Sequence, residues 1–239
     1  MDPTTCPYGP GAKSRASSPN LATRAALVDA SRIAATRARL GRPSTGLVLS
    51  GPQGSCKAAL LDQMRSGLEQ DGIHTVAMES AGGRSLPASL APGLHEALLR
   101  LSQLAPADAA ATRALRALVG FTAGLKGKYS DIELVQGPAP EPGLADNGDL
   151  EHDLQALLET AGDAARAAGS AVVLFVNQMH ELCDEDLGAL VGALHRCAQQ
   201  RLPVILVGAG LPSLPGRMGQ VRSYSERLFQ FHDLGRTGS

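Results

Sequence analysis

Residues 46–61 read GLVLSGPQGSCKAALL, an apolar run followed by a glycine-containing loop and a helical pattern. The apolar run 46–50 is bounded by glycine and predicts a buried strand. After the loop, apolar residues recur at helical spacing, at Leu60, Leu61, Met64 and Leu68. This spacing predicts a helix that ends at Asp71 and Gly72. A strand, a glycine loop and a helix in this order form the setting of the phosphate-binding motif G-x-x-x-x-G-K-[ST].

Two of the four fixed positions of this motif are altered. Gly51 and Lys57 match it, whereas Cys56 replaces the second glycine and Ala58 replaces the Ser or Thr. The backbone N–H groups of such a loop hold phosphate oxygens whatever the side chains are. The sequence therefore predicts a phosphate site made of eight residues: Gly51, Pro52, Gln53, Gly54, Ser55, Cys56, Lys57 and Ala58.

A second apolar run, AVVLFVN at 171–177, lies about 120 residues beyond the loop. A continuous apolar run is typical of a parallel strand that is buried on both faces. Nucleotide sites of this type place an Asp that orients Mg²⁺ and a catalytic acid that handles water near such a strand. Asn177 and Gln178 are the amide counterparts of that pair, so no catalytic residue is predicted at this strand end.

The rest of the chain predicts one α/β domain. Further strand-like runs stand at 74–79, 204–208 and 228–234, and helical patterns stand at 21–40, around 88–103 and 107–120, from 150, from 187 and near 217–227. Residues 121–149 are rich in turn residues and are predicted to form a hairpin or an ordered loop. Strands separated by helices favour a mainly parallel sheet.

Longer blocks of sequence resemble the actinobacterial-type AAA ATPases, an ATP-binding group related to origin-recognition-like P-loop ATPases. The blocks are PYGPGA at 7–12, LATR at 21–24, residues 46–61 quoted above, PGLADNGDLEHDL at 142–154, VLFVNQMHEL at 173–182, LPVILVGAGLPSLPG at 202–216 and RSYSERLF at 222–229. The last two blocks carry no generic motif and are the most specific to the family. The resemblance covers residues 7–234.

The resemblance implies a three-layer P-loop NTPase core of AAA type at 21–239, after an irregular arm at 1–20. It implies ATP or ADP at the carboxyl ends of the strands, with Lys57 as the phosphate lysine and Asn177 and Gln178 at the positions of the two acids. Arg227 is a candidate trans-acting arginine, and a structural role at the sheet edge is the alternative. Family members continue into a helical lid and a winged-helix-like region, and we expect both to be absent from this sequence.

The altered positions define the expected function. Ala58, Asn177 and Gln178 remove three parts of one hydrolytic mechanism, so we expect a hydrolysis-deficient pseudo-ATPase that acts as a switch or an inactive subunit. It would bind ATP or ADP, and the sequence gives little reason to expect Mg²⁺ or any other metal. The alternative is a nucleotide-free protein-interaction scaffold or a decaying ATPase copy, and whether the protein is an enzyme stays open.

Composition limits the partners. The chain has 239 residues, a formal net charge of -1 and 44% hydrophobic residues, which is ordinary for a globular domain. It shows no secretory signal and no apolar window of about 20 residues, and its four cysteines form no framework, so we expect a cytoplasmic protein without a membrane partner. An unknown protein partner is expected. Nucleic acid is a weaker candidate, through Arg37, Arg39 and Arg42, because the net charge argues against a large phosphate-contacting surface.

Overall fold

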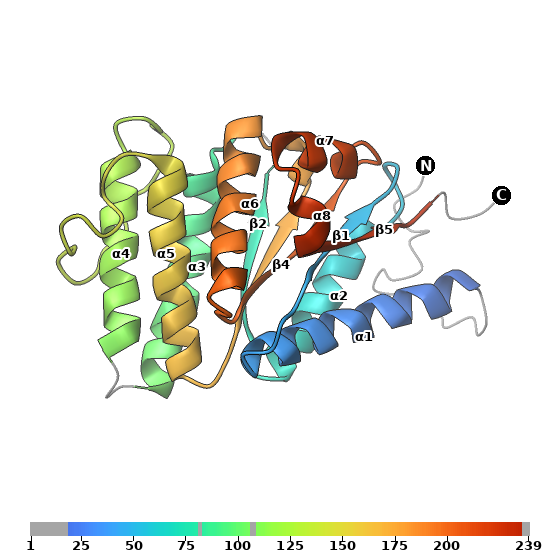
Figure 1. The fold of residues 1–239 in the computed structure, drawn as a ribbon, viewed down its shortest axis with the longest axis horizontal. Coiled ribbons are helices and arrows are strands. Elements are labelled where there is room, and N and C mark those ends of the chain that lie inside the picture. Colours follow the sequence, from blue (N-terminus) through green and yellow to red (C-terminus); the bar gives the residue numbers. More distant parts are fainter. Residues whose placement is uncertain (1–18, 81–82, 106–108, 236–239) are drawn as a thin grey trace.

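A five-stranded parallel sheet forms the centre of the computed structural model, which describes residues 19–80, 83–105 and 109–235 (Figure 1). The strands are β1 (Gly46–Ser50), β2 (His74–Glu79), β3 (Val172–Asn177), β4 (Val204–Gly210) and β5 (Phe229–Asp233). They lie in the order β2-β3-β4-β1-β5, and every neighbouring pair is parallel. The prediction of an α/β fold with a mainly parallel sheet is confirmed.

Helices cover both faces of the sheet. One layer holds α1 (Pro19–Arg39) and α2 (Lys57–Gln70), and the other holds α3 (Leu86–Leu104), α4 (Ala109–Leu125), α5 (Leu150–Ala167) and α6 (Asp184–Gln199) (Figure 1). Two short helices, α7 (Leu214–Val221) and α8 (Ser225–Leu228), and the 3₁₀ turn η2 (Met179–Glu181) complete the described elements. The predicted three layers are therefore present.

Strand β3 shows why the sequence requires two helix layers. Val173 and Phe175 pack on the side of α1 and α2, whereas Leu174 and Val176 pack on the side of α3 to α6. Successive side chains of a strand point to opposite faces, so a strand covered on both faces needs an unbroken apolar run. Each fully buried aliphatic side chain contributes about 1.5–3 kcal/mol relative to an exposed one.

Two predicted segments are corrected by the structure, at the start of α1 and at the end of α4. Helix α1 begins at Pro19, so residues 19 and 20 belong to the helix rather than to the arm, and residues 1–18 lie outside the described ranges. Helix α4 continues to Leu125, because Phe121 and Leu125 extend its buried face; the turn prediction for 121–125 was wrong. The remainder, 126–149, is a loop without strand, which selects the ordered loop from the two alternatives.

The helix predicted near 217–227 is interrupted. Arg222 has an extended backbone, with φ -143° and ψ 107°, and separates α7 from α8. Its guanidinium donates to both carboxylate oxygens of Glu151 on α5, each at 2.6 Å. The extended backbone at Arg222 ends the first helix, and this ion pair fixes the side chain there.

No helix within the described ranges combines the length and the apolarity needed to cross a bilayer.

Candidate functional site

The predicted phosphate loop joins the carboxyl end of β1 to the amino end of α2. Helix α2 begins at Lys57, and the side chain of its N-cap residue, Cys56, makes no capping hydrogen bond. Uncapped N–H groups at a helix amino end carry positive partial charge and attract anions. Asn177 ends β3 at the same edge of the parallel sheet, so the structure brings the two predicted parts of the site to one edge.

The loop keeps a left-handed turn where the motif has its second glycine. Cys56 adopts φ 57° and ψ 29°, and Gly54 adopts φ 82°. A side chain in this region costs about 1–2 kcal/mol, so glycine is usual there. At Gly51 a Cβ atom would lie 2.9 Å from Ser55 Oγ, which is closer than such atoms approach. The loop thus has a left-handed residue at the position of the second glycine although Cys56 occupies it, and a side chain at Gly51 would force Ser55 to shift.

Lys57 is bonded entirely within the loop. Its Nζ donates to the carbonyls of Gly51 and Pro52, both at 2.7 Å, and to Ser55 Oγ at 3.0 Å. An ammonium group has three N–H donors, so all of them are used. Partial burial lowers the pKa of Lys57 below the ordinary lysine value, because desolvation disfavours the charged form. A bound phosphate would take over at least one of these three bonds.

Arg24 joins the loop from α1. Its side chain is 1% exposed, and Nη2 donates to the carbonyl of Ser55 at 2.8 Å. The sequence prediction missed this residue. The available signal was its spacing, since Arg24 stands on the same helical face as the buried Leu27 and Ser31.

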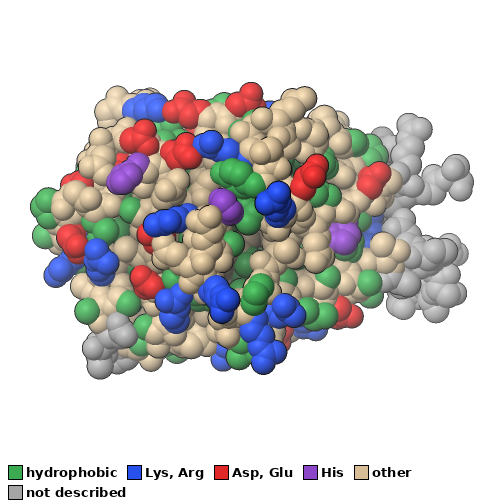
Figure 2. Space-filling view, in the orientation of Figure 1, with side chains coloured by type: hydrophobic (Ala, Val, Ile, Leu, Met, Phe, Trp, Pro, Cys, Tyr) green, Lys and Arg blue, Asp and Glu red, His purple; other side chains and the backbone are tan. Residues whose placement is uncertain are grey.

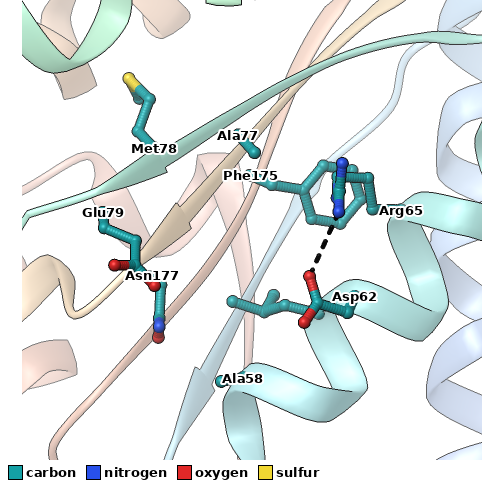
Figure 3. Close-up of a pocket in the computed structure, with 9 residues that line it drawn as sticks. Ala58, Asp62, Arg65, Ala77, Met78, Glu79, Phe175 and Asn177 are labelled. Carbon is teal, nitrogen blue, oxygen red and sulfur yellow. Dashed lines mark hydrogen bonds and ion pairs between the residues drawn. The ribbon is translucent and has the colours of Figure 1, made fainter.

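A cavity of about 140 Å³ opens beside the loop (Figure 3). It is lined by Ala58, Leu61, Asp62, Arg65, Ala77, Met78, Glu79, Phe175 and Asn177. Glu79 is the register partner of Asn177 on the neighbouring strand, and Figure 3 shows the two side chains next to each other. Glu79 was also missed, because its place beside Asn177 follows from the strand order.

The two predicted amides occupy different environments. Asn177 lines the cavity, and its Oδ1 accepts a hydrogen bond from the backbone N–H of Gln178 at 3.0 Å. Gln178 is left-handed, with φ 56° and ψ 39°, and leads into η2. The end of β3 is thus a tight turn, in which the side chain of Asn177 lies on the face of the sheet that packs against α2.

The residues at this edge include groups that attract phosphate, whereas two positions that hold Mg²⁺ in such motifs carry other residue types. Lys57 and the amino end of α2 supply positive charge for phosphate. Mg²⁺ is held through hydroxyl and carboxylate oxygens in such sites, but Ala58 has no hydroxyl and Asn177 has no charge. Among the described residues, no group of three or more His, Cys, Asp or Glu side chains is placed to hold a metal ion.

A comparison with family models matches residues 20–207 to the AAA ATPase domain. The chain belongs to this family. A comparison with curated proteins found no match. The matched range contains the loop, Arg24 and Asn177, so an AAA-type P-loop fold and a nucleotide-binding ancestry agree with the geometry described above. Arg227 lies outside the matched range of this AAA ATPase domain.

Arg227 stands at the edge of the AAA ATPase domain opposite the loop. It precedes β5, whose Phe229 pairs with Gly46 at the beginning of β1, whereas the loop follows the end of β1. Five strand residues span roughly 16 Å, so Arg227 does not reach the loop of its own chain. It lines a second cavity, of about 640 Å³, together with Ile33 and Arg37 of α1. A trans-acting role for Arg227 stays a prediction.

The basic residues near the end of α1 are exposed, and two of them are tied to backbone carbonyls. Arg37 Nε donates to Pro43 O at 2.9 Å, and Arg39 Nε donates to Gly169 O at 2.7 Å. Figure 2 shows Lys and Arg side chains gathered along the lower part of one face of the AAA ATPase domain, near the carboxyl end of α1. These bonds give Arg37 and Arg39 a structural role, and binding of nucleic acid here stays a prediction.

Proposed function

We propose that this AAA ATPase domain binds ATP or ADP at Gly51–Ala58 without hydrolysing it, and works as a switch or an inactive subunit. One observation carries the proposal. The loop keeps its left-handed turn and its lysine at the amino end of α2, while the positions that handle metal and water have lost their hydroxyl and carboxylates. The blocks at 202–216 and 222–229 further support a place among actinobacterial-type, origin-recognition-like ATPases.

Binding is supported by charge. The Lys57 ammonium bonds to two neutral carbonyls and one hydroxyl of the loop. Exchange of one of these for a phosphate oxygen replaces a neutral acceptor by a charged one, which adds a direct attraction between opposite charges. The N–H groups of the first turn of α2 add to this attraction, since the N-cap residue, Cys56, makes no side-chain capping bond to them.

Loss of hydrolysis is supported by chemistry. Phosphoryl transfer to water depends on a metal that neutralises developing charge and on a group that orients the attacking water. Ala58 and Asn177 offer the metal neither a hydroxyl nor a negative charge. The amide of Gln178 is not basic enough to accept a proton from water.

Thermal unfolding tests the proposal. Wild type, Lys57→Ala and Lys126→Ala are unfolded with and without millimolar ATP or ADP, in Mg²⁺ and in EDTA. Lys126 is the matched control, because its Nζ also donates to backbone carbonyls, at Ser130 and Ile132, but away from the loop. A ligand at 100 times its Kd adds about 2.7 kcal/mol, which raises Tm by a few degrees.

We expect this rise in wild type and Lys126→Ala, with or without Mg²⁺, and its loss in Lys57→Ala. No rise with any nucleotide would favour the nucleotide-free scaffold. Release of phosphate from ATP by the wild type, sensitive to Lys57→Ala, would contradict the proposed loss of hydrolysis.

A further inference from the structure

A buried chain of hydrogen bonds links α1 to the phosphate lysine. Arg24 Nη2 donates to the carbonyl oxygen of Ser55, and Lys57 Nζ donates to the hydroxyl of the same serine. Arg24 and Ser55 are 1% and 2% exposed. A buried charge is tolerated only where polar partners compensate its lost hydration, and the carbonyl of Ser55 is one such partner of this arginine.

The bond to Ser55 also orients the next residue. The carbonyl of Ser55 and the N–H of Cys56 belong to one planar trans peptide and point in opposite directions. A guanidinium that fixes the carbonyl on one side therefore fixes the Cys56 N–H on the other. Cys56 is the left-handed residue of the loop, and the neighbouring N–H groups of the loop and of α2 form the expected phosphate cradle.

We propose that Arg24 is a positioning residue for phosphate binding. It holds the peptide between Ser55 and Cys56 in the orientation that aims the Cys56 N–H at the phosphate, and through Ser55 it fixes the partner of Lys57. The affinity part of this inference rests on the proposed function, whereas the effect on loop order is independent of any nucleotide.

Two measurements on the full chain test the role of Arg24. Hydrogen exchange of the amides of residues 55–58 is measured without nucleotide, and the Kd for ADP is measured by calorimetry. The variants are Arg24→Ala and the milder Arg24→Lys, with Arg39→Ala as the matched control. Arg39 is an arginine of the same helix that also donates to a backbone carbonyl, at Gly169, but far from the loop.

We expect faster exchange confined to the loop and an ADP Kd raised at least tenfold in Arg24→Ala, with a smaller change in Arg24→Lys and none in Arg39→Ala. Guanidinium chloride at about 20 mM should restore part of the affinity of Arg24→Ala by filling the vacated space, whereas equal NaCl should not.

Three outcomes would overturn the role of Arg24. They are unchanged exchange at 55–58 in both Arg24 variants, exchange raised equally in the sheet strands, and equal loss of affinity in Arg39→Ala. If wild type does not bind ADP, the proposed function fails, and exchange at the loop still decides whether Arg24 positions it.

Discussion

Ser55 Oγ lies 3.0 Å from Lys57 Nζ, and this bond occupies the last of the three donors of the ammonium group. Ser55 Oγ itself donates to Pro52 O at 2.9 Å, so the hydroxyl is shared between the lysine and the loop backbone. The lysine is thus held by three bonds within the loop. A bound phosphate would replace at least one of them, and the charge of the ammonium group would then attract the phosphate oxygen directly.

The affinity for ADP should fall at alkaline pH. Burial lowers the pKa of Lys57, so this ammonium loses its proton at a lower pH than an exposed lysine, and only the charged form attracts phosphate. We expect the Kd, measured by calorimetry at constant ionic strength, to rise at a pH below the ordinary lysine pKa of about 10.4. In Lys57→Arg the Kd should stay constant over the same pH range, because a guanidinium keeps its proton throughout it. The same dependence of Kd on pH in wild type and Lys57→Arg would contradict the assignment of Lys57 as the lysine that binds phosphate.

Gly51→Ala should destabilise the fold and abolish nucleotide binding. The added Cβ would meet Ser55 Oγ at 2.9 Å, and Ser55 is held on both sides. Forced contacts of this kind cost about 1–3 kcal/mol. Gly216→Ala on α7 is the control, because a Cβ there meets nothing within 4 Å and should stabilise by about 0.4–1 kcal/mol. Urea unfolding compares them, and equal free energies of unfolding would refute the contact.

Restored metal ligands should make binding depend on Mg²⁺. Ala58 and Asn177 line the same cavity, so Ala58→Thr with Asn177→Asp places a hydroxyl and a carboxylate at one edge. We expect Mg²⁺ to tighten ATP binding about tenfold in this double variant and to have little effect on wild type, a change of about 1.4 kcal/mol. In the control, Ala59→Thr with Asn177→Asp, the hydroxyl is displaced by one helical position and Mg²⁺ should matter less. Indifference of the first variant to Mg²⁺ would be evidence against the lost metal site.

Stability should decline in mild acid. His74 is buried at the start of β2, with Nδ1 3.0 Å from Ser170 Oγ, and burial together with the charge of Arg100 lowers its pKa. Below the unfolded pKa of about 6.5, the unfolded chain therefore binds more protons than the folded one. The free energy of unfolding is thus retained above that pH and is lost as the pH falls below it.

Burial also lowers the pKa of His232, so two histidines contribute to this slope. His74→Gln should flatten the decline between about pH 7 and pH 5, as measured by urea unfolding. His152→Gln, an exposed position on α5, should leave it unchanged. If the free energy of unfolding of His74→Gln fell with pH as steeply as that of the wild type, the acid sensitivity would lie in other residues.

The sequence was sufficient for features encoded by local pattern. The apolar run at β3 and the glycines around the loop identified the strands and the loop, because burial on two faces and left-handed backbone restrict residue type. The contact of Arg24 with Ser55 and the pairing of Glu79 with Asn177 depend on which elements become neighbours. The ion pair of Arg222 with Glu151, 71 residues away, likewise depends on which elements become neighbours.

Helix α1 runs from the carboxyl ends of the strands to their amino ends. It has 21 residues and is therefore about 30 Å long. Near its amino end Arg24 donates a hydrogen bond to Ser55 of the loop, and near its carboxyl end Arg39 donates one to Gly169, just before β3. Between them, Ala30, Ile33 and Ala34 line the cavity of about 640 Å³. The same helix therefore contacts the phosphate loop through Arg24 and forms part of the wall of this second cavity.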